Sequence, residues 1–207
     1  MGSANLYLDE VDFLKYLNRD DCHRCGFPTC QDFLEAIRSG LKTPHDCIFL
    51  NDNKAYALET VCTMNKLWPE VPLLLHPRPS QTGLVEINSP DPQALLLITG
   101  NNEYTEEILL TVLSTTVCPF FVLFTDTDGN TVDMALIYQT MTAERIQKAL
   151  EESDAEKRIE TKQMIIPGLA FALKDAIQTE TGWNVTTGPR CAAELPLFLS
   201  HIWIPPE

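Results

Sequence analysis

The sequence has no hydrophobic run long enough to cross a bilayer. A membrane-spanning helix needs about 20 consecutive apolar residues, and the apolar stretches of this chain, such as residues 94–98, are far shorter. Its first residues also lack the basic and apolar regions of a secretory signal peptide. We therefore expect a cytoplasmic protein, in which disulfides are rare.

Basic residues are scarce. The chain of 207 residues has 15 Lys and Arg against 29 Asp and Glu, which gives a formal net charge of −14. Such an acidic surface repels the phosphates of nucleic acids and of anionic lipids. Nucleic acids and membranes are therefore not expected as partners, whereas a protein with a basic patch is compatible with this charge.

Familiar catalytic and nucleotide-binding motifs are also missing. The sequence contains neither G-x-G-x-x-G nor a P-loop, so nucleotide binding is not supported. The segment from Asp126 to Gly129 resembles the start of a calcium loop, but its glycine comes too early and Ile137 replaces the closing glutamate. No Ser-His-Asp or Cys-His pair indicates a catalytic centre. Whether the chain is an enzyme stays open.

Cysteine is dense in one stretch. Four of the seven cysteines follow the spacing C-x2-C-x4-C-x16-C, at Cys22, Cys25, Cys30 and Cys47. The sequence favours a helix that begins at Cys30, where the positive end of the helix dipole would stabilise a thiolate. Four thiolates suit either an iron–sulfur cluster or zinc. A structural zinc site usually has two C-x-x-C pairs and this stretch has one, which favours a [4Fe-4S] cluster and leaves zinc as the alternative.

The second half of the chain alternates apolar strands with amphipathic helices. This alternation predicts an α/β fold with a doubly wound, largely parallel sheet and helices on both faces. The expected strands are residues 94–99, 120–125, 132–138, 163–166 and 184–187. The expected helices are residues 106–113, 142–152, 170–179 and 192–201, with further helices over residues 8–17 and 51–65.

Short polar or glycine-bearing segments follow these strands. Ligands of such sheets bind beyond the carboxyl ends of the strands, and glycine there lets the backbone approach a large flat ligand. One such segment alone is typical of a turn, whereas four along one edge indicate a binding site. The candidate binding residues are Thr99, Gly100, Asn101, Asn102, Gly129, Asn130, Thr131, Val132, Pro167, Gly168, Leu169, Ala170, Gly188, Pro189 and Arg190.

Prolines are frequent between residues 69 and 92, and they predict an extended connector. We therefore divide the chain into a cluster module at residues 1–54, a Pro-rich linker at 55–92 and a cofactor-binding domain at 93–207. The linker would either swing the small module or hold it in a fixed packing, with Trp68 and residues 73–75 buried between the two parts.

The segment from Cys22 to Cys30, followed by a helix and by Asp46-Cys47, resembles the N-terminal cluster module of a known family. This family is the large subunit of corrinoid iron–sulfur proteins of the acetyl-CoA pathway. Two features depart from its pattern: Ile48 stands where proline is usual, and His23-Arg24 replaces a small or acidic pair. Neither change removes a cysteine.

The second half is similar to the C-terminal corrinoid-binding domain of the same family. The similar segments are residues 83–92, 96–100, 126–130, 165–170, 182–185 and 188–190, in the same order. Residues 101–104 depart from the family's pattern, which puts the contacts of that loop in doubt. The family's middle domain, a TIM barrel, has no counterpart between the two similar parts.

The resemblance implies a carrier of methyl groups and electrons with a [4Fe-4S] cluster and a cobalamin. The cluster would reduce Co(II) to Co(I), and a methyltransferase or a reductive activator protein would be the partner. None of the four histidines lies in an Asp-x-His-x-x-Gly motif, so a base-off cobalamin is expected. Two alternatives stay open: a corrinoid-binding or storage module without methyl transfer, and a zinc-stabilised interaction protein.

Overall fold

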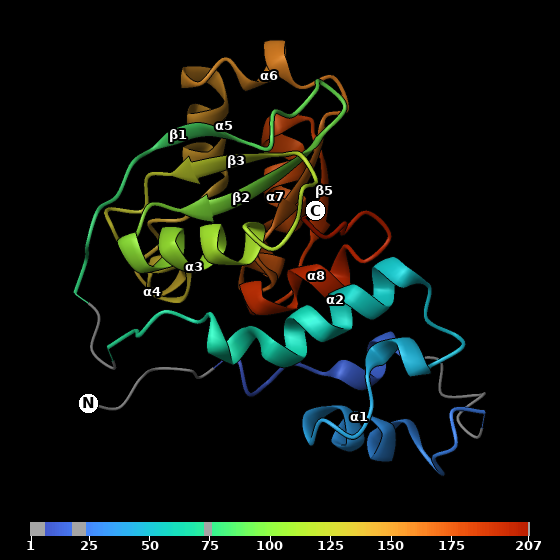
Figure 1. The fold of residues 1–207 in the computed structure, drawn as a ribbon. Coiled ribbons are helices and arrows are strands. Elements are labelled where there is room, and N and C mark those ends of the chain that lie inside the picture. The colour runs from blue at the N-terminus through green and yellow to red at the C-terminus, as the bar shows by residue number, and fades with distance from the viewer. Residues whose placement is uncertain (1–6, 18–23, 73–75, 207) are drawn as a thin grey trace.

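The computed structural model describes residues 7–17, 24–72 and 76–206. Its centre is a five-stranded sheet with the strand order β1-β3-β2-β4-β5 (Figure 1). Four strands are parallel, and β1 runs antiparallel to β3 at one edge. The strands are β1 (Gly83–Ile87), β2 (Leu95–Gly100), β3 (Phe120–Thr125), β4 (Gln163–Ile166) and β5 (Asn184–Thr187). The predicted α/β class with a largely parallel sheet is confirmed.

Helices cover both faces of the sheet. The first face packs against α2 (Asp52–Thr63), α3 (Glu103–Leu113) and α8 (Leu195–Phe198). The second packs against α4 (Val132–Ile137), α5 (Ala143–Glu152), α6 (Ala155–Arg158) and α7 (Lys174–Thr181). Side chains of one strand alternate between the two cores: in β3, Val122 faces the first core and Leu123 the second. A strand buried on both faces explains the continuous apolar runs.

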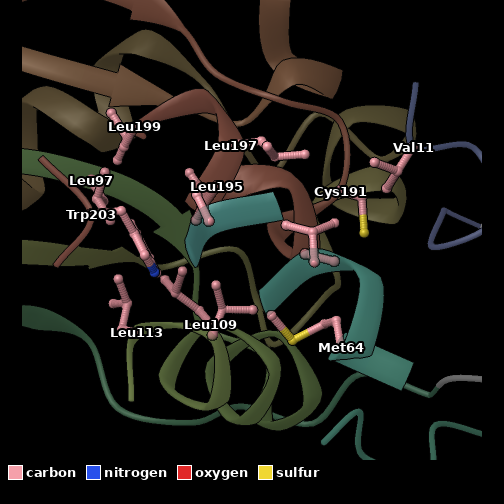
Figure 2. Packing of buried hydrophobic residues seen from close by; sticks show 14 of the residues in the cluster. Val11, Met64, Leu97, Leu109, Leu113, Cys191, Leu195, Leu197, Leu199 and Trp203 are labelled. Carbon is pink, nitrogen blue, oxygen red and sulfur yellow. The ribbon is translucent and has the colours of Figure 1, made fainter. Parts of the chain in front are cut away.

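The first core closes around the end of the chain (Figure 2). Trp203 is fully buried, and its ring lies 6.0 Å from that of Phe120. Leu195, Leu197 and Leu199 join the same cluster. The last helix is therefore part of the core rather than a surface appendage.

Several predicted elements differ from the structure. Residues 132–138, predicted as a strand, form the short helix α4, which begins after Thr131. Residues 170–179 divide into the 3-10 helix η5 (Gly168–Leu173) and α7, and residues 192–201 divide into η6 (Ala192–Glu194) and α8. The helix expected over residues 8–17 is a single 3-10 turn, η1 (Phe13–Tyr16). Short apolar runs do not distinguish helix from strand by periodicity, which explains α4.

The segment expected as a linker contributes to the packed fold. The helix α2, the short η4 (Met64–Lys66) and the edge strand β1 all lie within residues 55–92 or begin just before them. Trp68 packs against the first core. Residues 73–75, for which a strand was considered, lie outside the described residues. The residues on both sides of this gap are thus packed into the fold, whereas the domain limits at 54 and 92 and the choice between a swinging and a fixed module stay predictions.

The cysteine-bearing part lies on the far side of α2 from the sheet (Figure 1). It contains α1 (Cys30–Arg38) and the 3-10 turn η3 (Pro44–Asp46). Leu34 of α1 is 2% exposed and belongs to the first core. Within residues 7–17, 24–72 and 76–206, no helix has the length and apolar character that a membrane crossing requires.

Candidate cofactor site at the carboxyl edge of the sheet

A mostly apolar cavity of about 410 Å³ lies where β2 and β4 end. The chain leaves β2 into α3 on one face of the sheet and leaves β4 into η5 and α7 on the other. The strand connections therefore diverge between β2 and β4, and open α/β sheets bind ligands at such a point. The volume is within the range of small-molecule sites.

Two strands and one helix provide much of the apolar lining. Leu97 of β2 and Ile165 of β4 face the cavity together with Ile108 and Leu109 of α3. The polar groups are few, and one of them is the carboxylate of Asp133, which accepts a hydrogen bond of 2.6 Å from the Thr131 hydroxyl. An apolar cavity with a few placed polar groups is typical of a cofactor or ligand site.

The structure brings eight of the fifteen candidate binding residues to this cavity. They are Thr99, Thr131, Val132, Pro167, Leu169, Gly188, Pro189 and Arg190. The other seven do not line it: Gly100, Asn101, Asn102, Gly129, Asn130, Gly168 and Ala170. Three of the four predicted loops thus contribute residues beyond a strand end, whereas the loop after β2 contributes only Thr99.

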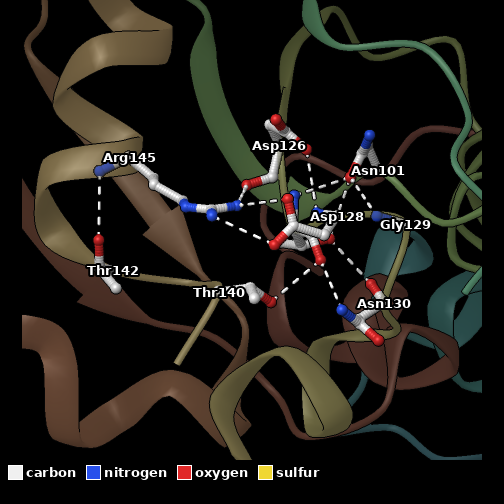
Figure 3. A network of polar contacts seen from close by, with 9 residues as sticks. Asn101, Asp126, Asp128, Gly129, Asn130, Thr140, Thr142 and Arg145 are labelled. Atoms are coloured by element: carbon white, nitrogen blue, oxygen red, sulfur yellow. Dashed lines mark hydrogen bonds and ion pairs between the residues drawn. The ribbon is translucent and has the colours of Figure 1, made fainter. Parts of the chain in front are cut away.

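Asn101 organises the loop that follows β3 (Figure 3), and Asn102 contributes a further contact to it. The Oδ1 atom of Asn101 accepts hydrogen bonds from the Thr127 N–H at 2.8 Å and from the Gly129 N–H at 3.2 Å. The Asn102 amide donates to the Gly129 carbonyl at 2.7 Å, and its Oδ1 caps α3 by accepting from the Tyr104 N–H. Both asparagines are buried, so their side chains hold the loop after β3 in place.

Residues 78–80 cover the same two loops. The Arg78 N–H donates to the Gly129 carbonyl at 2.8 Å, and the Ser80 N–H donates to the Asn101 carbonyl at 2.9 Å. A Cβ atom on Gly129 would lie 2.5 Å from the Pro79 nitrogen. Residues 78–80 therefore cover the loops after β2 and β3 at this edge of the sheet. This explains why Asn101 and Gly129 do not reach the cavity.

Gly168 and Gly188 follow β4 and β5 at positions where neighbouring protein atoms leave no room for a side chain. In the structure, a Cβ on Gly168 would lie 2.6 Å from the Pro189 carbonyl carbon, and one on Gly188 would lie 2.8 Å from Ile165 Cγ2. Gly168 thus lets the loops after β4 and β5 approach each other, and Gly188 lets the loop after β5 pack against β4.

The sequence analysis missed the residues that line the cavity from outside the strand ends. Tyr7 and Leu8 come from the start of the described chain, and Trp68 and Val71 come from the segment after α2. Burial and the nearby carboxylate of Asp133 raise the pKa of Tyr7. No local pattern marks these residues, whereas the amphipathic helix after β2 could have indicated Tyr104 and Ile108.

Three of the four predicted cysteine ligands lie in the described residues. Cys25, Cys30 and Cys47 are each partly buried, and Cys22 lies outside the described residues. Cys30 is the first residue of α1, which is capped by the Thr29 hydroxyl as it accepts from the Asp32 N–H at 3.1 Å. Cys47 directly follows η3.

The donor chemistry of these cysteines fits an iron–sulfur cluster. Within the described ranges, which exclude Cys22, no three His, Cys, Asp or Glu side chains form a group that could hold a metal. Two further cysteines are shielded: burial raises the pKa of the Cys62 and Cys191 thiols to about 11. A buried thiol with a raised pKa is a poor nucleophile and a poor ligand.

Both the cysteine-bearing segment and the sheet domain match models of protein families. Residues 58–199 match the sequence model of the CO dehydrogenase/acetyl-CoA synthase delta subunit family. Residues 17–49 match a model described as "Putative Fe-S cluster".

Individual relatives agree with these matches. The acetyl-CoA decarbonylase/synthase complex subunit gamma of Methanopyrus kandleri is 30% identical over 74% of this chain and 33% of its own length. The corrinoid/iron-sulfur protein large subunit of Moorella thermoacetica is 27% identical over 81% of this chain and 37% of its own length. The chain thus spans about a third of the length of the curated relatives it matches.

The cysteine-bearing segment and the sheet domain therefore match in the order that the sequence resemblance indicated. The family model covers more than half of the chain, including every strand of the sheet. The chain belongs to the CO dehydrogenase/acetyl-CoA synthase delta subunit family.

Proposed function

We propose that this protein binds a corrinoid and a [4Fe-4S] cluster and serves as a carrier of methyl groups and electrons. The observation that carries the proposal is the cavity between β2 and β4, which eight of the candidate binding residues line. A relative that matches 81% of the chain is named a corrinoid/iron-sulfur protein large subunit.

The corrinoid would lie over the ends of the strands, at the apolar cavity. The surrounding loops would hold it through Thr131, Leu169 and Pro189, which line the cavity. When bound, its cobalt supplies the methyl-accepting and methyl-donating chemistry, and the protein supplies binding and orientation. Among the described residues, none that line the cavity is histidine, which supports a base-off form without a histidine ligand.

The cluster would be held by Cys22, Cys25, Cys30 and Cys47, and it would supply single electrons. Support comes from the position of Cys30 at the start of α1, where the helix dipole favours negative sulfur. The match of residues 17–49 to an Fe-S model supports the same assignment.

A protein partner is part of the proposal. Relatives are named as subunits of an acetyl-CoA decarbonylase/synthase complex. We propose a methyltransferase or a reductive activator protein, with a basic patch that complements the charge of −14.

A second candidate function is corrinoid binding or storage without methyl transfer. It is favoured by the cover that Tyr7, Leu8 and Trp68 provide, since these residues already line the cavity that a methyl donor would approach.

The decisive experiment is spectroscopy of the anaerobically purified protein with and without added hydroxocobalamin. We expect a visible corrinoid spectrum that stays with the protein through gel filtration, and about four irons and four sulfides per chain. Bound zinc without iron would refute the cluster, and nitrogen hyperfine splitting from histidine in the Co(II) resonance spectrum would refute the base-off form. If a low-potential donor reduces bound Co(II) equally fast in wild type and in Cys25→Ala, the cluster is not the electron route and the storage function is favoured.

A further inference from the structure

Residues 7–17, which we call the strap, lie against the loop that follows β5. Tyr7 and Leu8 line the apolar cavity, and Val11 and Leu17 are buried in the first core (Figure 2). The strap has one regular element, the four-residue turn η1. So short a helix has no stability of its own, so contacts with the rest of the protein hold the strap in place.

The main contact is a buried carboxylate. Glu194 is 5% exposed and lies in η6, just after the cavity-lining residue Cys191. The Tyr16 hydroxyl donates a hydrogen bond of 2.5 Å to Glu194 Oε1, and the Lys15 ammonium forms an ion pair with the same oxygen. Burial and this hydrogen bond raise the pKa of Tyr16 above its ordinary range.

Both side-chain partners of Glu194 in the described part of the chain come from the strap. A buried carboxylate is costly unless it is paired and hydrogen-bonded. The strap therefore stabilises Glu194, and Glu194 in turn holds the strap in place. The two partners Tyr16 and Glu194 are 178 residues apart in the sequence.

The other polar contacts of the strap are weaker and border a cavity. A second cavity of about 230 Å³ lies between the strap and the loop after β5, and it shares Tyr7, Arg190 and Cys191 with the apolar cavity. Arg190 pairs with Glu10 at 3.6 Å, but both side chains are more than half exposed, and exposed pairs contribute little. Besides the apolar burial of Val11 and Leu17, the Glu194 contacts are therefore the main polar restraint on the strap.

We propose that the strap is a lid on the apolar cavity, latched shut by Tyr16 and Lys15 on Glu194, and that its release opens the cavity to a ligand. That this ligand is a corrinoid rests on the proposed function, whereas the opening itself is a property of the protein alone. It can therefore be measured without any ligand.

The thiol of Cys191 reports the opening. It is 5% exposed and borders both cavities beside the strap. Cys118 is equally buried but lies elsewhere, against the Ile202 carbonyl, so it reports unfolding of the core. Alkylation by iodoacetamide, followed for each cysteine by mass spectrometry of peptides, gives the two rates in the same molecule.

The test variant is Tyr16→Phe, which removes the latch hydroxyl and leaves the ring. We expect Cys191 to react about tenfold faster, the factor that corresponds to about 1.4 kcal/mol, while the rate at Cys118 stays the same. The matched control is Tyr56→Phe, which removes a hydrogen bond of 2.6 Å to the Thr115 carbonyl, away from the strap. It should leave the Cys191 rate unchanged. Glu194→Gln, which removes the charge, should act in the same direction as Tyr16→Phe.

An unchanged Cys191 rate in both Tyr16→Phe and Glu194→Gln would overturn the latch. An equal rise at Cys191 and Cys118 would also overturn it, because the latch would then stabilise the whole fold rather than a lid. A further arm adds hydroxocobalamin to the wild type, and protection of Cys191 would indicate that the corrinoid occupies the cavity. Absence of protection together with faster labelling in Tyr16→Phe would refute the proposed function and keep the lid.

Discussion

Replacing Gly168 by alanine tests whether contact between two loops positions the cavity. The Gly168 N–H donates to the Pro189 carbonyl at 2.8 Å, so the loops after β4 and β5 are joined at this point. An added Cβ would lie 2.6 Å from the Pro189 carbonyl carbon and 2.7 Å from the Arg190 nitrogen. Both are backbone atoms, which cannot rotate away as a flexible side chain can. The loop after β5 must therefore shift.

The magnitude follows from the cost of overpacking a well-packed site, which is about 1–3 kcal/mol. Each kcal/mol lowers the melting temperature of a chain of this size by roughly 2–4 °C, so we expect a decrease of roughly 2–12 °C. Because Pro189 and Arg190 line the cavity, affinity for cobalamin should also fall, by about tenfold for each 1.4 kcal/mol of lost contact. Differential scanning calorimetry and spectroscopic titration measure the two effects.

Gly182→Ala is the matched control. Gly182 has a φ of +70° and no atom within 4 Å of an added Cβ, so alanine adds backbone strain of about 1–2 kcal/mol without moving a cavity loop. It should lower the melting temperature and leave cobalamin affinity unchanged. A Gly168→Ala protein with wild-type melting and wild-type affinity would show that the close approach of the two loops does not depend on glycine at this position.

Three further predictions follow from the buried asparagine and the cysteines. Asn101→Ala should destabilise the fold by roughly 1–3 kcal/mol for each buried donor that loses its acceptor, which urea unfolding can measure. A loss of stability below the error of that measurement would contradict the role of the Asn101 side chain in holding the loop after β3. Alanine at Cys25, Cys30 or Cys47 should abolish the cluster, whereas alanine at Cys62 or Cys118 should leave the iron content intact, and retention of full iron by any of the first three variants would exclude that residue as a ligand. The free energy of unfolding should fall as the pH rises from about 9 to about 11. The Cys191 thiol has a pKa of about 11 in the folded protein and near 9.0 in the unfolded chain, so only the folded protein keeps this proton in that range. An equally steep fall in Cys191→Ala would assign the slope to other groups.

Long apolar strands were the most predictable part of the fold. The bounds of β3 and β4 agree with the prediction, because each run is bordered by polar or proline residues. The bounds of β5 also agree, although this strand has a single apolar residue, Val185. The helix α5 was also predicted with its cap at Thr142, whose hydroxyl accepts from the Arg145 N–H. Such elements can be predicted from local sequence, because the residues that begin and end them lie within a few positions of each other.

The edge strand β1 and the helix α4 could not be predicted from local sequence. Pro79 and Pro90 flank β1 closely and made the segment resemble a connector, yet an edge strand tolerates prolines beside it. Its pairing with β3 depends on residues more than 30 positions later, such as Phe124 opposite Gly83. In α4, a single buried residue, Ala135, is too little to reveal a helical period.

Only part of the candidate site could be predicted from the sequence, again because local patterns do not reveal contacts between distant segments. Residues just beyond strand ends were found because parallel strands bring their carboxyl ends to one edge. Tyr7 and Trp68 reach the cavity from distant segments, and only the three-dimensional path of the chain reveals them. The role of Asn101 as an acceptor for the Thr127 and Gly129 N–H groups is likewise invisible without the loop geometry.

The packing of α2 against α8 bears on how the protein matures during synthesis. The helix α2 spans Asp52–Thr63 and shares the first core with Leu195, Leu197 and Trp203. On the ribosome, α2 emerges long before these partners, so its buried face must wait until residues 195–203 have been made. The cysteine-bearing segment that rests on α2 waits with it. Insertion of the cofactors that we propose into the finished fold would therefore follow the synthesis and packing of Trp203.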